Sequence, residues 1–214
     1  MSLATELKAF QTQFRSNVPQ DIQSVMGQAT TDLAASGIID QSLKVGDLIP
    51  EFTLSDATGK TVTITEVLTQ GPVVLAFYRG GWCPYCNLEL KALQNVLPEI
   101  EAAGATLIAI SPETPDNSLT TQEKNELAFT VLSDIDNQVA REFGLVFQLP
   151  AVLRPIYQSF GINIAAHNGN DHFELPLPAT YVVLPNRDIV YAFADPDYTQ
   201  RAEPSDVVAA LQNL

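Results

Sequence analysis

The chain has 214 residues, of which 46% are hydrophobic and 17% are charged, a balance typical of a globular protein with a sizeable core. The formal net charge of −14 and the lack of a basic cluster argue against nucleic-acid binding, because phosphates would be repelled. Apolar runs fall short of the roughly 18–20 residues that cross a bilayer, and the first residues do not resemble a signal peptide. We therefore expect a cytoplasmic protein that binds no membrane.

The first 36 residues are predicted to be helical, because apolar side chains recur at three- and four-residue steps. Pro19 divides this region into two helices, and Gly37 is a typical stop. We interpret residues 1–44 as a helical extension for packing or for a possible homodimer, and residues 45–214 as the main domain.

The main domain alternates short apolar segments with helical patterns. The expected strands cover residues 52–54, 62–64, 73–77, 105–110, 129–132, 180–184 and 189–193. The expected helices cover residues 65–68, 87–103, 118–127, 137–143, 151–160 and 205–211. Glycine-containing and proline-containing turns make the first two strands and the last two strands hairpins, and residues 145–176 show the least regular pattern. This order predicts an α/β fold with a mixed central sheet and right-handed crossovers.

Both cysteines lie in the segment Trp82-Cys83-Pro84-Tyr85-Cys86, between the strand at 73–77 and the following helix. Two cysteines three positions apart on the first turn of a helix can close a small disulfide ring. The free N–H groups and the positive end of the helix dipole should lower a thiol pKa below its usual value of about 8.5. Arg79 adds a positive charge, and Pro84 favours entry into the helix. The pattern therefore predicts a redox site.

A metal site is the alternative that the cysteines raise. Zinc would need two further ligands, and the spacing of His167 and His172 matches no known zinc pattern. We expect no metal, place both histidines on the surface, and find no glycine-rich cofactor motif.

Several short motifs together resemble the peroxiredoxin family (AhpC/TSA, redoxin) over residues 45–214. They are Gly46-Asp47, Pro50-Glu51-Phe52-Thr53-Leu54, Gly59-Lys60, residues 73–78, Leu132-Ser133-Asp134, Val139 with Phe143-Gly144, and residues 179–185. The resemblance implies a thioredoxin fold, with a mixed sheet flanked by helices and an N-terminal hairpin.

Aligning Phe77-Tyr78 with the family's Phe-Tyr-Pro motif places Cys86 at the peroxidatic cysteine and Glu89 at the family's glutamate. Three family positions differ. Arg79, Cys83 and Pro178 stand where the family has proline, threonine and arginine. Arg201 is a conceivable substitute for the missing arginine, although an arginine before the last helix is expected to lie on the surface.

The cysteine segment itself is similar to the active sites of thioredoxins and glutaredoxins, with Trp82 and Tyr85 shaping the site. Leu177-Pro178-Ala179-Thr180 is similar to the thioredoxin-fold loop whose proline is cis and faces the cysteines. That resemblance makes Pro178 and Thr180 site-shaping residues.

Three functions remain open. In a thiol-dependent peroxidase, Cys86 attacks a peroxide and Cys83 then forms the disulfide. In a protein disulfide oxidoreductase, Cys83 attacks a substrate disulfide and Cys86 resolves the intermediate. Either cycle requires a thiol reductant such as thioredoxin or glutathione. The third function is a redox-sensing interaction protein without turnover.

Overall fold

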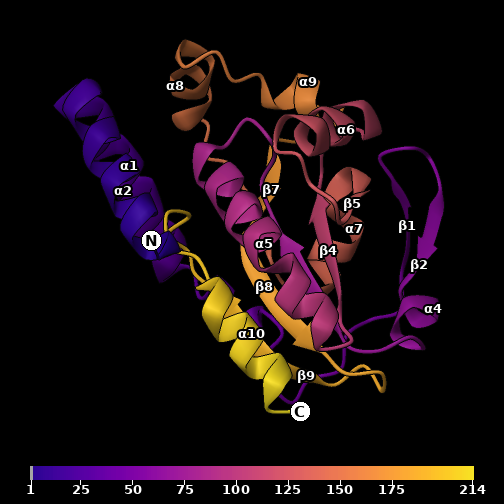
Figure 1. Ribbon diagram of the computed structural model, residues 1–214. Helices are drawn as coiled ribbons and strands as arrows, with labels where there is room; N and C mark the ends of the chain where they lie inside the picture. Colours follow the sequence, from indigo (N-terminus) through magenta and orange to yellow (C-terminus); the bar gives the residue numbers. More distant parts are fainter. Residues whose placement is uncertain (1) are drawn as a thin grey trace.

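A mixed sheet of seven strands forms the centre of the molecule (Figure 1). The computed structural model describes residues 2–214. In spatial order the strands are β2 (Thr61–Thr63), β1 (Thr53–Asp56), β5 (Thr130–Ser133), β4 (Thr106–Ser111), β3 (Val73–Phe77), β8 (Ala179–Val183) and β9 (Ile189–Ala194). β3, β4 and β5 pair in parallel, whereas β8 is antiparallel to both β3 and β9, and β1 is antiparallel to both β2 and β5. The predicted mixed sheet and both predicted hairpins are confirmed.

Helices cover both faces of this sheet. They are α1 (Leu3–Asn17), α2 (Gln20–Ala35), α3 (Ile38–Gln41), α4 (Ile64–Leu68), α5 (Pro84–Ala102), α6 (Pro115–Lys124), α7 (Gln138–Glu142), α8 (Leu153–Ser159), α9 (Ile164–Asn168) and α10 (Pro204–Gln212), with a 3-10 turn at Ile135–Asn137. In Figure 1, α5 and α10 lie side by side in front of the sheet. None of the helices within residues 2–214 has the length and apolar character of a membrane-crossing helix.

Strand β3 is fully apolar because helices cover both faces of the sheet. Val74 and Ala76 belong to a core cluster with side chains of α5 and α10. Val73, Leu75 and Phe77 point the other way, into a second cluster that includes side chains of α4 and α7. Because alternate residues of a strand face opposite sides, both faces demand apolar residues. β3 is therefore a rigid base for the loop that follows it.

The N-terminal helices pack directly on the main domain. Leu3 and Leu7 of α1 are buried in the cluster that includes α5. The Glu203 carboxylate accepts hydrogen bonds from the backbone N–H groups of Leu3 and Ala4, at 3.2 and 2.6 Å, and so caps α1. The predicted break near Pro19 is confirmed, since α1 ends at Asn17 and α2 begins at Gln20. The division at residues 44 and 45 stays a prediction.

Two strands and one helix in the least regular segment were not predicted from sequence, and neither was the short helix α3 after Gly37. β6 (Val146–Gln148) and β7 (Glu174–Pro176) form a separate antiparallel pair, and α9 lies between them in the chain. All three fall within residues 145–176. The polar helix expected from residue 118 begins earlier, with Pro115 at its start, and ends at Lys124. Pro98 lies on the exposed side of α5.

Candidate active site

The two cysteines lie at the point where β3 leads into α5. Cys83 is the N-cap residue of α5, with φ −88° and ψ 113°, and Pro84 occupies the first turn, as expected. Cys86 follows in that turn. Both cysteines are free and buried, with exposed fractions of 2% for Cys83 and 0% for Cys86. A helix N-terminus and a low-dielectric interior therefore act on both thiols.

Two glycines allow the chain to turn between β3 and α5. Gly80 has a φ of +147°, and a Cβ there would lie 2.3 Å from Nε1 of Trp82. A Cβ on Gly81 would lie 1.9 Å from Oγ1 of Thr121 in α6. A Cβ at either position would clash with a neighbouring side chain, that of Trp82 at Gly80 and that of Thr121 at Gly81, so both positions favour glycine.

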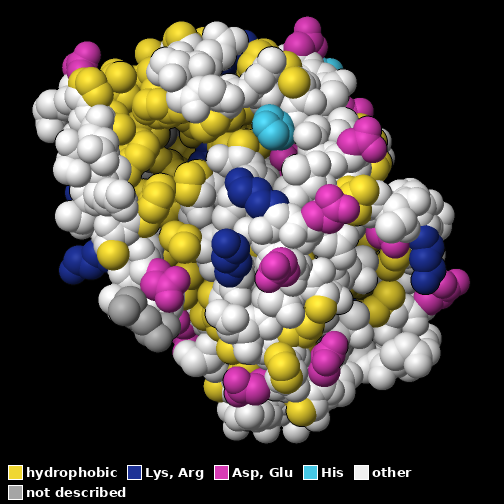
Figure 2. All heavy atoms as spheres, turned by 45° about the horizontal axis from the view of Figure 1, so that its top comes forward, with side chains coloured by type: hydrophobic (Ala, Val, Ile, Leu, Met, Phe, Trp, Pro, Cys, Tyr) yellow, Lys and Arg dark blue, Asp and Glu magenta, His cyan; other side chains and the backbone are white. Residues whose placement is uncertain are grey.

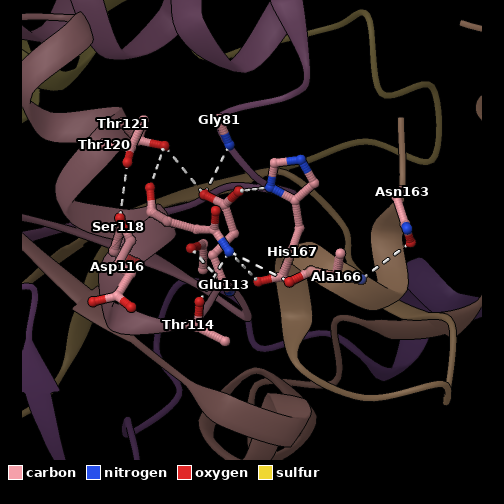
Figure 3. A network of polar contacts seen from close by, with 12 residues as sticks. Gly81, Glu113, Thr114, Asp116, Ser118, Thr120, Thr121, Asn163, Ala166 and His167 are labelled. Atoms are coloured by element: carbon pink, nitrogen blue, oxygen red, sulfur yellow. Dashed lines mark hydrogen bonds and ion pairs between the residues drawn. The ribbon is translucent and has the colours of Figure 1, made fainter. Parts of the chain in front are cut away.

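A buried carboxylate holds this loop from below (Figure 3). Glu113, which has an exposed fraction of 0%, accepts hydrogen bonds from Gly81 N–H at 2.9 Å and from the Thr121 hydroxyl at 3.2 Å. Its other oxygen lies 3.0 Å from Nδ1 of His167. His167 was expected at the surface, and its side chain is 30% exposed while its ring nitrogen reaches this buried carboxylate; the side chain of His172 is exposed as expected.

Arg201 reaches the cysteines from the segment before α10. Its Nη2 lies 3.3 Å from Sγ of Cys86, and its Nε donates to Oε2 of Glu89 at 2.7 Å. Its Nη1 donates to the backbone carbonyl oxygens of Tyr198 and Gln200. The expectation of a surface arginine is wrong, because these four acceptors hold the guanidinium inside the fold. Arg201 therefore places a positive charge beside the cysteine pair, where it stabilises a thiolate.

Arg79 is a second buried guanidinium, with an exposed fraction of 2%. Its Nη2 donates to the Tyr157 hydroxyl at 2.5 Å. The group lies 5.0 Å from the Trp82 ring, 5.6 Å from the Tyr157 ring and 4.4 Å from the Tyr198 ring. Within residues 2–214 no carboxylate forms an ion pair with it. Three aromatic rings therefore surround this charge, which also lowers the pKa of Cys83.

These charges give the two thiols different pKa values. Burial alone would raise the pKa of Cys83, but the hydrogen bond with Cys86 and the charges of Arg79 and Arg201 lower it below the usual value. Burial and the neighbouring Cys83 raise the pKa of Cys86 well above its usual value. The two shifts therefore favour a pair that holds one proton near neutral pH, with the thiolate on Cys83.

Glu89 gives this site a stability that depends on pH. Burial raises the pKa of Glu89 to about 7, although the charge of Arg201 opposes the rise. An unfolded glutamate titrates near ~4.3, so between that pH and about 7 the folded state keeps a proton that the unfolded state has lost. Stability from this group is therefore complete below ~4.3 and is lost as the pH rises through the folded pKa.

We expect Glu89→Gln to remove this loss of stability at rising pH. Between pH 5 and pH 7, the urea-derived free energy of unfolding of the variant should gain about 2 kcal/mol relative to the wild type. The lowered pKa of Cys83 adds stability as the pH rises in both proteins, so it cancels in the comparison. Parallel stability curves for the two proteins would contradict the raised pKa of Glu89.

The remaining predicted site residues surround the cysteines to different degrees. Trp82 packs against Tyr157, with ring centroids 5.8 Å apart, and Tyr85 is buried against Phe10 of α1 at 5.1 Å. Thr180 is buried, and its hydroxyl lies 3.5 Å from Oε1 of Glu89.

The expected cis peptide bond before Pro178 is wrong, because no peptide bond in the described part of the chain is cis. Pro178 is buried and lines a pocket together with Arg79. Within residues 2–214, no group of three or more His, Cys, Asp or Glu side chains is placed to hold a metal ion.

Comparison with known proteins connects this geometry to a family. The model of the AhpC/TSA family matches residues 45–192, more than half of the chain. The chain belongs to the AhpC/TSA family. The matched range contains both cysteines, Arg79 and Glu89, whereas Arg201 and the helices α1 and α2 lie outside it.

One curated relative is similar to part of this chain in sequence, and two solved structures share its fold. Peroxiredoxin Bcp of Escherichia coli (strain K12) is 36% identical over 103 residues, which are 48% of this chain and 65% of Bcp. The chain thus spans less than two thirds of this curated relative. Peroxidoxin BcpB from Mycobacterium tuberculosis superposes with a TM-score of 0.64 at 22% identity, over 80% of this chain and 98% of BcpB. The Bacterioferritin Comigratory Protein of Xanthomonas campestris superposes with a TM-score of 0.60 at 19% identity, over 78% and 98% of the two chains. The predicted thioredoxin fold is confirmed.

Three residues of this AhpC/TSA site were not identified from sequence. Glu113 stands just after the apolar strand β4, where a polar residue at the carboxyl end of a parallel strand is a usable signal for a site. Tyr157 lies in the helix expected at residues 151–160 and Tyr198 in a segment without a marked pattern, and only the folded chain brings them to Arg79.

Proposed function

We propose that this protein is a thiol-dependent peroxidase that cycles Cys83 and Cys86 between a dithiol and a disulfide. The observation that carries this proposal is the convergence of two buried guanidinium groups, Arg79 and Arg201, on two free buried thiols. Such charges stabilise a thiolate and the negative oxygen that leaves when a peroxide bond breaks. The family membership supports the same reading.

The geometry favours Cys83 as the cysteine that attacks first, a point that the sequence left open. Cys83 lines a small cavity of about 50 Å³, whereas Cys86 has an exposed fraction of 0%. The lowered pKa of Cys83 also makes it the thiolate of the pair. Its sulfur would bond to the outer oxygen of ROOH, and RO⁻ would leave with the electrons of the O–O bond. The proton held by Cys86 would pass to RO⁻ and give ROH.

The second half of the cycle closes the disulfide. The Cys86 thiolate would attack the sulfenic acid on Cys83, forming the S–S bond and releasing hydroxide, which takes a proton from solvent. Two electrons from a thiol reductant such as thioredoxin or glutathione would then restore both thiols. A reducing cytoplasm, the location expected from the sequence, would supply such a reductant.

A disulfide oxidoreductase is the second candidate, and one observation favours it. A lowered pKa at the N-cap cysteine, paired with a raised pKa at the cysteine three positions later, suits attack on a disulfide as well as on a peroxide. The burial of Cys83 argues against a disulfide oxidoreductase. Cys83 is 2% exposed and lies beside Tyr85 and side chains of α1. A protein disulfide would have to displace that cover.

Steady-state turnover separates these functions. With dithiothreitol as reductant, the wild type should consume hydrogen peroxide or cumene hydroperoxide catalytically, and it should reduce insulin disulfides no faster than dithiothreitol alone does. Fast insulin reduction without peroxide consumption would show that the protein is a disulfide oxidoreductase and not a peroxidase. A reversible disulfide without turnover of either substrate would leave only the redox-sensing function.

A further inference from the structure

Two side chains that the proposed cycle does not use lie beneath the cysteine loop, which is residues 78–83 between β3 and α5. Glu113 follows β4, and His167 comes from α9. Figure 3 shows the Glu113 carboxylate between Gly81 and His167. A carboxylate only accepts hydrogen bonds, so Nδ1 of His167 is the donor across their 3.0 Å contact. This contact joins α9, through Glu113, to the backbone two residues before Cys83.

His167 is held in this position by its own backbone. Its carbonyl oxygen accepts hydrogen bonds from Thr114 N–H and from Asn117 Nδ2, both at 3.0 Å. Thr114 directly follows Glu113, and Asn117 lies in the first turn of α6. The carboxylate and the imidazole are therefore fixed on backbone segments that are bonded to each other. The pair is a rigid support for the loop and not a flexible surface contact.

The other side of the loop is tied to α5 through Asn87. Nδ2 of Asn87 donates to the Gly81 carbonyl at 2.8 Å, and the backbone N–H of Asn87 donates to the Cys83 carbonyl at 3.1 Å. Gly81 is thus held by Glu113 on one side and by α5 on the other. The two glycines of the loop would otherwise give it many conformations. The hydrogen bond from Gly81 to Glu113 therefore helps to keep Cys83 at its N-cap position, three residues before Cys86.

We propose that Glu113 and His167 are positioning residues that keep Cys83 within reach of Cys86 once Cys83 has been oxidised. The inference rests on the proposed peroxidase function. The sulfenic acid on Cys83 has two fates. Cys86 can attack its sulfur, which forms the disulfide and releases hydroxide, or a second ROOH can transfer its outer oxygen to that sulfur, which gives a sulfinic acid and ROH. The first reaction is intramolecular and needs the two sulfurs in line, whereas the second does not involve Cys86. A fixed loop therefore favours the reversible disulfide over the irreversible sulfinic acid.

The position of the loop can be followed without any peroxide. Trp82 is the only tryptophan of the chain, and it lies within the loop. Trp82 and Cys83 line the same small cavity, which shares Arg79 and Tyr157 with a larger pocket, the hollow with hydrophobic walls in Figure 2. Acrylamide quenches tryptophan fluorescence on contact, so its quenching rate constant measures how readily the loop opens.

The test uses the reduced full-length protein and three histidine variants. His167→Leu removes the donor to Glu113, and we expect the acrylamide quenching rate constant of Trp82 to rise about twofold. During turnover of excess hydrogen peroxide with dithiothreitol, the sulfinic acid found on Cys83 by mass spectrometry should rise about tenfold. His167→Asn places an amide nitrogen where Nδ1 was and should keep both wild-type values. His172→Leu is the matched control, because this second histidine has a side chain that is 57% exposed, and both values should again stay unchanged.

Each outcome decides the proposal. A rise in both quantities in His167→Leu that is absent from the other two variants supports it, and a rise that those variants share overturns it. A folded His167→Leu protein that keeps either wild-type value overturns the positioning role and leaves the peroxidase function intact. If the wild type consumes no peroxide, the peroxidase function fails and the protection of Cys83 fails with it. His167→Phe, which also lacks the donor, repeats the test if His167→Leu does not fold.

Discussion

Arg201→Met should destabilise the folded protein by about 3–5 kcal/mol at pH 8, above the pKa of Glu89, because it removes one partner of a buried ion pair. The lost guanidinium leaves the Glu89 carboxyl without its 2.7 Å partner and removes the donor to Cys86 Sγ. Urea unfolding followed by circular dichroism measures this loss. The pKa of Cys83 should also rise. A pH titration followed by the thiolate absorbance at 240 nm measures this change.

A double variant separates the two effects. Arg201→Met with Glu89→Leu removes both charges, and replacing a buried pair by apolar groups is often close to neutral. We therefore expect most of the stability to return, while the thiol pKa stays raised, because the positive charge is still missing. A double variant with a normal thiolate titration would show that Arg201 acts only on folding.

Gly81→Ala should destabilise the protein by about 3 kcal/mol and disrupt the cysteine loop, because its Cβ would lie 1.9 Å from Thr121 Oγ1. To relieve this contact the loop must move away from α6. The movement would break the hydrogen bond from Gly81 N–H to Glu113 and the bond from Asn87 Nδ2 to the Gly81 carbonyl, at 2.9 and 2.8 Å. The midpoint temperature of thermal unfolding and the rate of reaction with peroxide should both fall.

Another glycine of the chain provides the control. Gly27 lies on the exposed side of α2, and a Cβ there would meet nothing within 4 Å. Gly27→Ala should therefore stabilise the protein by about 1 kcal/mol, since alanine has a higher propensity than glycine for the interior of a helix. Combining Gly81→Ala with Thr121→Ala should recover part of the loss, because the clashing hydroxyl is removed. A Gly81→Ala protein with wild-type stability would contradict the close packing of the loop on α6.

The parts of this molecule that sequence could predict are those that local patterns determine. β3 is recognisable because both of its faces are buried, and the start of α5 is recognisable from Pro84 and the paired cysteines. The family resemblance then placed these elements in a thioredoxin fold. Glu89 was identified in the same way, through its spacing from Cys86.

The parts that sequence did not predict depend on contacts between distant segments. Arg201 is 115 residues from Cys86, so the choice between a surface arginine and a thiol partner depended on how α10 packs. His167 likewise meets Glu113 across 54 residues. The extension was expected only to pack or to dimerise. No local pattern indicated that side chains of α2 would line a pocket with Arg79.

Single-turnover oxidation of two cysteine variants tests the central claim most directly. Reduced Cys86→Ser should react with hydrogen peroxide faster than a free thiol does, and dimedone should trap a sulfenic acid on Cys83. Reduced Cys83→Ser should react slowly, because the pKa of Cys86 is raised by burial. Fast oxidation that survives in Cys83→Ser and is lost in Cys86→Ser would contradict the account and return the first attack to Cys86.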